Sequence, residues 1–257
     1  MKKLPLFVLL PLAILSSGCS NKTQLNVFAA ASMTETLNQI KEAYEKEHSD
    51  IELKLNFESS GTLLKQIQNG ADCDLFISAA PKQMNALQEA ELLNNESRIN
   101  LLENKVALVV PDGNPKSVTS FANLKDRLLA KEEGFIVAIG DKDVPVGQYT
   151  EKIMAYYQID MEEHKSMFTL GSNVKVVTTT VKEAGAACGI VYQTDAKSAN
   201  LTVVDTATKD MCGQVIYPAA TLKNAKQLEE ATKFLEYLKG EEASKVFEDV
   251  GFTALNK

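Results

Sequence analysis

Hydrophobic positions along the chain follow two periods that succeed one another. Short apolar or alternating runs typical of β-strands are each followed by a stretch with apolar residues at helical spacing. In the first part of the chain this pattern predicts strands at 25–29, 51–57 and 74–78 and helices at 32–47, 61–69 and 81–92. Strands that alternate with helices in this way imply a parallel sheet with right-handed crossovers.

The alternation restarts at a strong predicted strand, 105–111. The pattern then predicts helices at 120–130, 146–157 and 174–185, strands at 135–140, 188–192 and 201–204, extended segments at 167–170 and 214–220, and helices at 225–239 and 241–249. Two such units do not by themselves establish two domains.

The first 18 residues have the pattern of an export signal. Lys2 and Lys3 precede an apolar run, 4–15, that is shorter than the ~20 residues a membrane-spanning helix needs. A small residue then precedes Cys19, and polar residues follow it, which resembles the bacterial lipoprotein processing site. Ser16 stands where such sites favour an aliphatic residue. We therefore expect a mature protein tethered to the membrane by lipid on Cys19, with plain secretion as the alternative.

The net charge of the chain restricts the classes of ligand that it can bind. The chain carries 27 basic and 34 acidic residues, and removal of Lys2 and Lys3 with the signal leaves a net charge near −9. This balance argues against nucleic acid as a partner. An anionic ligand would have to be held by local donors, because long-range attraction cannot recruit it.

Beyond Cys19 the chain has three cysteines, Cys73, Cys188 and Cys212, with no C-x-x-C spacing. This number and spacing indicate neither a zinc cluster nor a disulfide framework. A bridge between Cys188 and Cys212 stays open, and buried free thiols are the favoured interpretation.

The sequence predicts no catalytic residues. It contains none of the common nucleophile, phosphate-loop or zinc-protease motifs. The two histidines, His48 and His164, lie in charged and therefore surface-like surroundings, which disfavours a Ser-His or Cys-His pair. Asp72 and Asp74 are interpreted as helix caps or solvent-facing groups, so no metal ligands are predicted.

Four junctions run into predicted helices through small, hydroxyl or otherwise uncharged residues. At the first, Ser32 and Glu35 have capping-box spacing. The four junctions are 28–35, 57–62, 144–147 and 171–174. Helix starts expose unpaired N–H groups at the positive end of the helix dipole, which suits an anion, although ordinary capping explains each junction equally well. Lys175 is the one basic residue close to these turns.

Tyr192 is a further candidate donor. It closes the predicted strand 188–192, and ligands of open α/β sheets lie at the carboxyl ends of strands. Packing at the rim of a lobe is the alternative.

Several motifs together, in this order and spacing, resemble a known family. They are Val27-Phe28-Ala29-Ala30-Ala31-Ser32, Ser59-Ser60-Gly61-Thr62-Leu63, Asp74-Leu75-Phe76-Ile77-Ser78-Ala79, Val144-Pro145-Val146-Gly147, Gly189-Ile190-Val191-Tyr192, Tyr217-Pro218 and Gly251-Phe252. The chain resembles the molybdate-binding periplasmic component of ABC importers, the ModA family, over about 25–252.

The resemblance implies an α/β fold of the type II, Venus-flytrap periplasmic binding class, with a mixed, mostly parallel sheet in each of two lobes. We expect lobe 1 to comprise 25–104 and 214–257, and lobe 2 to comprise 105–213, after a signal peptide (1–18) and a tether (19–24). The implied ligand is molybdate or tungstate, passed to an ABC importer permease by a lipid-anchored, exported monomer that needs no cofactor. The implied donors to the oxyanion are Ser32, Ser60, Ala79, Val146, Val174 and Tyr192.

Three positions depart from the family pattern. Glu58 would repel a dianion unless its side chain points away, Gly61 stands where a further hydroxyl often occurs, and Cys73 replaces a small residue. A receptor for another tetrahedral oxyanion such as sulfate is the alternative within this class, and a secreted lipoprotein enzyme is the alternative outside it.

Overall fold

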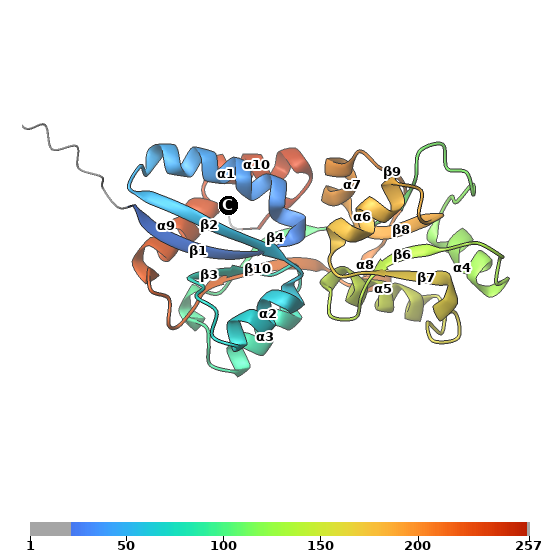
Figure 1. The fold of residues 1–257 in the computed structure, drawn as a ribbon, viewed down its shortest axis with the longest axis horizontal. Helices are drawn as coiled ribbons and strands as arrows, with labels where there is room; N and C mark the ends of the chain where they lie inside the picture. The colour runs from blue at the N-terminus through green and yellow to red at the C-terminus, as the bar shows by residue number, and fades with distance from the viewer. Residues whose placement is uncertain (1–21, 256–257) are drawn as a thin grey trace, which may run out of the picture.

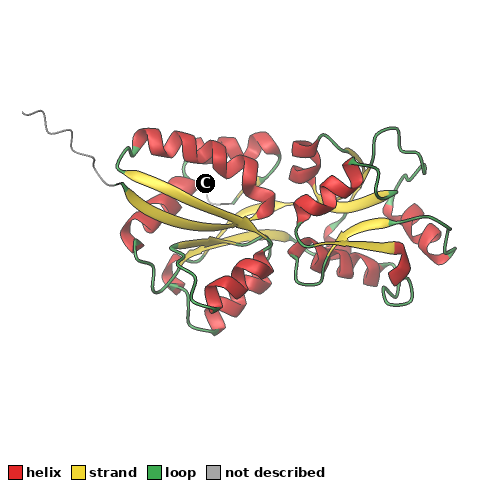
Figure 2. Cartoon of the chain, in the orientation of Figure 1, coloured by secondary structure: helices red, strands yellow, loops and turns green. Residues whose placement is uncertain are grey.

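The computed structural model describes residues 22–255, and the chain in this range forms two lobes side by side (Figures 1 and 2). The predicted signal peptide and Cys19 lie outside the described residues. Between residues 22 and 255 no helix is both long and apolar enough to cross a bilayer.

The first lobe is built on a six-stranded sheet with the order β11-β4-β10-β3-β1-β2. Its strands are β1 (Thr23–Ala30), β2 (Ile51–Glu58), β3 (Leu75–Ile77), β4 (Ile99–Asn104), β10 (Val215–Thr221) and β11 (Thr253–Ala254). Its helices are α1 (Thr34–Glu47), α2 (Ser60–Gln68), α3 (Pro81–Glu89), α9 (Leu228–Lys239) and α10 (Glu241–Val250), with 3-10 turns η1 (Ala31–Met33) and η2 (Asn95–Ser97).

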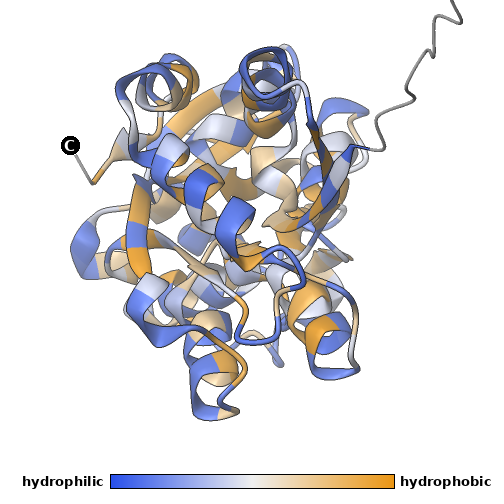
Figure 3. Ribbon diagram, turned by 90° about the vertical axis from the view of Figure 1, so that its left-hand side faces the viewer, coloured by the Kyte–Doolittle hydropathy of each residue, from blue (hydrophilic) through white to orange (hydrophobic). Residues whose placement is uncertain are grey.

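Strand β1 shows why helices cover both faces of this sheet. Successive side chains of a strand point to opposite faces, and here both sets include buried apolar residues. Leu25 and Val27 join the core that includes α1, α9 and α10, whereas Phe28 joins a smaller core with residues of α2 and α3. Figure 3 shows the same arrangement, with hydrophobic residues concentrated on the strands and hydrophilic residues on the outer parts of the helices.

The second lobe is built on a five-stranded sheet with the order β7-β6-β8-β5-β9. Its strands are β5 (Val106–Val110), β6 (Val137–Gly140), β7 (Phe168–Gly171), β8 (Cys188–Tyr192) and β9 (Thr202–Thr206). Its helices are α4 (Phe121–Leu129), α5 (Pro145–Tyr156), α6 (Val174–Lys182), α7 (Gln193–Ala199) and α8 (Lys209–Cys212), with the 3-10 turn η3 (Lys165–Met167). Helices α6 and α7 lie on one face of the sheet, and α5 and α8 lie on the other (Figure 1).

The chain passes between the two sheets twice. It leaves the first sheet after Asn104, enters the second at Val106, and returns between Cys212 and Val215. Strand β10 then runs through the middle of the first sheet, antiparallel to both β3 and β4. The two connections lie side by side between the lobes, as a hinge requires (Figure 1).

The two-lobe α/β fold with mixed sheets is confirmed, with one correction. Within residues 22–255, the pairs β1/β2 and β1/β3 are parallel in the first sheet, and β6/β7 and β6/β8 are parallel in the second, while the remaining strand pairs are antiparallel. Parallel pairing therefore does not predominate, because the strands next to each crossover enter the sheets in the opposite direction. Strand β4 and helix α7 were not predicted from the hydrophobic pattern.

Candidate functional site

The two lobes enclose one small cavity where the carboxyl ends of their strands face each other. The segments after β1, β2 and β3 reach it from the first lobe, and those after β6, β7 and β8 reach it from the second. The residues that line it are Ala30, Ala31, Ser32, Ser59, Ser60, Ala79, Val144, Pro145, Val146, Val174 and Tyr192. Ligands of open α/β sheets bind at this edge. The structure thus brings all six residues predicted as donors to one place, although their role as ligand contacts stays a prediction.

The cavity suits only a compact ligand. Its volume is about 10 Å³, close to the smallest space that holds one water molecule. A ligand of five heavy atoms would require the lobes to separate slightly. An amino acid or a sugar would need a much wider opening.

Three α-helices direct uncapped N–H groups toward this cavity. The Ser59 side chain accepts from Thr62 at the start of α2, so it leaves the Ser60 N–H uncapped. The Asn173 side chain accepts from the second and third N–H groups of α6, which leaves that of Val174. Because helix N-termini carry partial positive charge, these groups favour an anion.

Helix α5 presents a donor for a different reason. Its N-cap, Val144, makes no side-chain hydrogen bond, and Pro145 at the first position has no N–H. The N–H of Val146 is therefore the first that the helix offers. Pro145 also fixes the backbone in helical geometry at the cavity wall.

Ser60 and Ala79 are paired in the structure. The Ala79 N–H donates to Ser60 Oγ at 2.9 Å, and Ser60 is fully buried. This bond orients the hydroxyl and leaves its hydrogen available for another acceptor. Ala79 would have to share its N–H between Ser60 and a ligand to act as a donor itself.

A hydrogen-bond chain orients Ser32 from the hinge. Asn104, the last residue of β4, donates from Nδ2 to Tyr217 Oη at 3.3 Å, and Tyr217 Oη lies 2.9 Å from Ser32 Oγ. The orientation of the Asn104 amide is fixed because its Oδ1 accepts the Lys105 N–H. Tyr217 Oη keeps its own hydrogen, so it can donate to Ser32, and in that arrangement the Ser32 hydrogen is free for a ligand.

The predicted capping box at this junction is wrong. Residues 31–33 form a 3-10 turn and α1 begins only at Thr34, with no side-chain cap. Ser32 bonds Tyr217 instead of the backbone, and Glu35 forms an ion pair with Lys175 of the second lobe.

Tyr192 is a buried phenol without a hydrogen-bond partner among the described residues. It is the N-cap of α7, its side chain is 1% exposed, and the Tyr217 ring packs edge-on with centroids 5.6 Å apart. Burial, followed by the neighbouring Tyr217 and Tyr149, raises the pKa of Tyr192 well above its usual value. The hydroxyl is therefore a permanent donor, and a buried polar group left unpaired in this way requires an explanation.

The cavity wall carries no formal charge. None of the eleven described residues that line it is acidic or basic. Glu58 does not face the cavity; its carboxylate accepts from Asn173 Nδ2 at 3.4 Å, across the lobe interface. The repulsion expected from Glu58 is thus avoided by its orientation.

Gly61 lies where the two lobes touch beside the cavity. A Cβ built on Gly61 would lie 2.1 Å from the backbone oxygen of Asp143, in the second lobe. One turn further along α2, Lys65 Nζ pairs with Asp143 Oδ2 at 2.6 Å. In place of a hydroxyl, glycine at 61 therefore permits close approach of the lobes.

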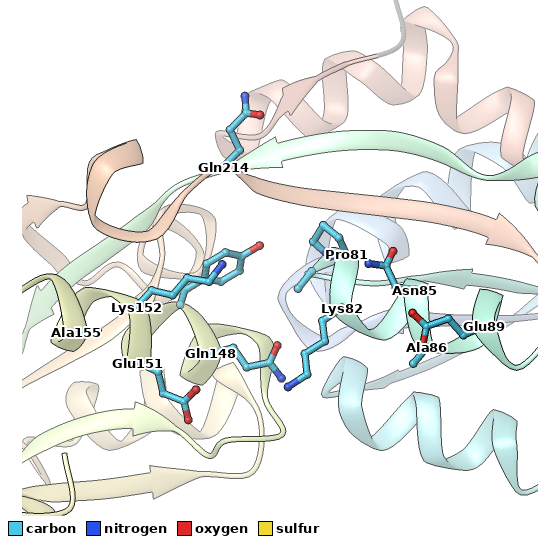
Figure 4. A pocket seen from close by; sticks show the side chains of 12 residues that line it. Pro81, Lys82, Asn85, Ala86, Glu89, Gln148, Glu151, Lys152, Ala155 and Gln214 are labelled. Atoms are coloured by element: carbon cyan, nitrogen blue, oxygen red, sulfur yellow. The ribbon is translucent and has the colours of Figure 1, made fainter. Parts of the chain in front are cut away.

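A larger groove of about 790 Å³ opens between α3 and α5, beside Gln214 (Figure 4). Its lining residues are Ala80, Pro81, Lys82, Asn85, Ala86, Glu89, Gln148, Tyr149, Glu151, Lys152, Ala155 and Gln214. Two lysines and two glutamates give this groove charges of both signs. It does not offer the set of neutral donors that converges on the smaller cavity.

None of the histidines and cysteines that the structure describes lines the cavity. Contrary to the prediction, His164 is 4% exposed, and its Nδ1 lies 2.8 Å from the carbonyl oxygen of Asp160. The three described cysteines are free and buried, as favoured from sequence, and burial raises the pKa of Cys188 to about 12. Within residues 22–255 no cluster of three or more His, Cys, Asp or Glu side chains could hold a metal ion.

Sequence reasoning missed two residues next to the cavity, Asn104 and Tyr217. Tyr217 belongs to a motif shared with the ModA family, so its position carried a signal, but nothing local indicated that it contacts Ser32. Asn104 follows a strand that the hydrophobic pattern did not reveal. Both act on the site through other residues.

Two α/β lobes joined by two crossovers and closed on a small polar cavity define a solute-binding protein of the Venus-flytrap class. The profile of the bacterial extracellular solute-binding protein family matches residues 25–253. The name of YvgL of Bacillus subtilis describes a putative ABC transporter substrate-binding lipoprotein. It is 35% identical over an alignment of 265 positions, which covers 98% of this chain and 99% of that one. The molybdate-binding protein ModA of Haemophilus influenzae is 33% identical over 99% of this chain and 100% of its own.

A solved structure agrees with these sequence relatives. The periplasmic molybdate-binding protein of Azotobacter vinelandii superposes with a TM-score of 0.78 at 18% identity, over 90% of this chain and 99% of that one, which shows a common fold. The chain belongs to the bacterial extracellular solute-binding proteins and is a ModA-like member of them. The predictions that it is exported and is not an enzyme are confirmed by this membership.

Proposed function

We propose that this protein captures molybdate or tungstate outside the cytoplasm and delivers it to the permease of an ABC importer. The observation that carries the proposal is the small, uncharged cavity toward which hydroxyls and helix N-termini of both lobes converge. The names of full-length relatives, at 33% and 35% identity, support the ligand and the transporter class. The oxyanion is the cargo, and no resident cofactor is required.

Neutral donors fit a dianion better than lysines would. A buried dianion held by N–H and O–H groups avoids burial of a counter-charge, which would cost several kcal/mol. Each charge-assisted hydrogen bond contributes about 1.5–3 kcal/mol, so six of them support submicromolar affinity after the cost of association. Backbone N–H groups can only donate, so a protonated ligand oxygen that faces one of them would find no acceptor, which favours fully deprotonated oxyanions.

Isothermal titration of the mature chain without its lipid-bearing cysteine, from residue 20 onward, tests this ligand assignment. We expect one-to-one binding of molybdate and tungstate, and no heat with sulfate, whose shorter bonds would leave donors out of reach. Binding of sulfate in preference to molybdate would replace the assignment by the alternative oxyanion. Absence of binding heat with all three ions would mean that the shared motifs indicate the fold and not the ligand.

Ser60→Ala should weaken molybdate binding at least tenfold. The substitution removes one charge-assisted bond to the ligand, worth about 1.5 kcal/mol or more, whereas the loss of the acceptor for the Ala79 N–H affects the stability of the free and bound protein alike. Titration calorimetry gives the affinity. Ser244→Ala, which alters another buried serine away from the cavity, should bind like the wild type, and unchanged affinity of Ser60→Ala would remove Ser60 from the site.

We further propose that Cys19 carries the lipid that holds the protein at the membrane. The lipobox-like residues around Cys19 support this, as does the lipoprotein designation of the Bacillus subtilis relative. Cys19→Ala should move the protein from the membrane fraction to the soluble extracytoplasmic fraction, measured by fractionation and immunoblot. Retention on membranes would contradict the anchor.

We propose a monomer as the working form, since one chain supplies both walls of the cavity.

A further inference from the structure

Lys175 joins the two lobes through two carboxylates. Its Nζ lies 2.6 Å from Glu35 Oε2, on α1 of the first lobe, and 3.2 Å from Asp195 Oδ1, on α7 of the second lobe. The lysine itself is the second residue of α6. A single ammonium group thus holds together the starts of three helices from both sides of the cleft.

The side chains of Glu35, Lys175 and Asp195 differ in exposure, and they therefore have different roles. The Asp195 side chain is fully buried, Lys175 is 28% exposed and Glu35 is 51% exposed. Burial raises the pKa of Asp195 to about 6, and the charge of Lys175 opposes this rise. Lys175 is therefore held from within its own lobe by a buried acid, and Glu35 is the partner that opening of the cleft would release.

Each member of this cluster adjoins a proposed donor. Lys175 follows Val174, Asp195 lies three residues after Tyr192, and Glu35 lies three residues after Ser32. The cluster therefore fixes the position of three of the six donors relative to one another. Its effect on the ligand would be geometric.

On the basis of the proposed function, we propose that Lys175 and Glu35 are positioning residues that clamp the cleft shut over the oxyanion. The ammonium group of Lys175 does not attract the anion electrostatically, because the charges of two carboxylates beside it offset its own. A contact that exists only in the closed form increases the closed fraction and so tightens apparent binding. The clamp therefore slows release of the ligand and leaves its capture by the open form unchanged.

The experiment compares Glu35→Ala with Glu42→Ala and Lys175→Arg. Glu42 is an exposed acid on the same helix with no ion pair among the described contacts, so it controls for the loss of charge. The probe is the rate at which labelled tungstate leaves the protein into excess unlabelled tungstate. We expect release about three- to tenfold faster for Glu35→Ala at low salt, wild-type release for Glu42→Ala, and slow release for Lys175→Arg, with smaller differences at high salt.

Small-angle X-ray scattering of the ligand-free proteins supplies a readout that needs no oxyanion. Glu35→Ala should have a larger radius of gyration than the wild type and Glu42→Ala, because its lobes separate more often. If the wild type does not bind tungstate, the ligand assignment is wrong. The scattering result alone then decides whether Lys175 and Glu35 hold the lobes together. Release rates and radii equal to those of Glu42→Ala would overturn the clamp.

Discussion

Gly61→Ala should weaken molybdate binding about 100-fold without damage to the fold. The added Cβ would lie 2.1 Å from the Asp143 carbonyl oxygen, so the lobes could close only with an offset. An offset of this kind breaks one or two charge-assisted bonds, each worth about 1.5–3 kcal/mol. Within helix α2, alanine is favoured over glycine by about 0.5–1 kcal/mol, so the ligand-free protein should unfold at the same temperature or slightly higher. Calorimetric titration and thermal unfolding measure the two effects.

Lys65→Ala is the matched control for this substitution. It removes the exposed ion pair to the same aspartate without adding an atom to the interface. Exposed ion pairs contribute about 0–1 kcal/mol, so the loss in affinity should stay below about fivefold. Equal effects of the two substitutions would show that Gly61 is not needed for close approach of the lobes.

Tyr192→Phe should lower the affinity for molybdate at least tenfold and raise the stability of the ligand-free protein. The hydroxyl is buried without a partner, so its removal relieves an unsatisfied group, which costs about 1–3 kcal/mol in folded proteins. With a ligand present the same hydroxyl becomes a charge-assisted donor, and its loss costs binding energy. Titration calorimetry and thermal unfolding without ligand report the two opposite changes.

Tyr44→Phe separates the two effects. Tyr44 also carries a buried hydroxyl without a hydrogen-bond partner, but its ring packs against Phe234 and Tyr237 in the core of the first lobe. Tyr44→Phe should raise stability and leave affinity unchanged. If Tyr192→Phe behaves in the same way, Tyr192 serves only in packing.

Much of the cavity could be predicted from sequence because its parts are local. A strand followed by a small or hydroxyl residue at a helix start is visible in a few residues, as at Ser60 and Val174. Tyr192 was found because it ends an apolar strand. Ala79 has no such local feature and was predicted only from the resemblance to the ModA family.

The parts that sequence missed depend on contacts between distant segments. Tyr217 meets Ser32 across 185 positions, because β10 returns through the middle of the first sheet. Glu35 has the spacing of a capping residue, yet tertiary structure gives it Lys175, 140 positions away. The charged neighbours of His164 in the sequence predict a position at the surface, whereas the fold buries its ring. These pairings are properties of the assembled lobes and leave no trace in local patterns.

The direct test of the central claim is a crystal structure of the mature protein with tungstate, in which anomalous scattering locates the metal. We predict a single strong peak between the lobes, with oxygens about 2.7–3.0 Å from Ser32 Oγ, Ser60 Oγ, Tyr192 Oη and the N–H groups of Val146 and Val174. A peak elsewhere, or a tungstate held by lysine or arginine side chains, would contradict the account of a neutral donor site.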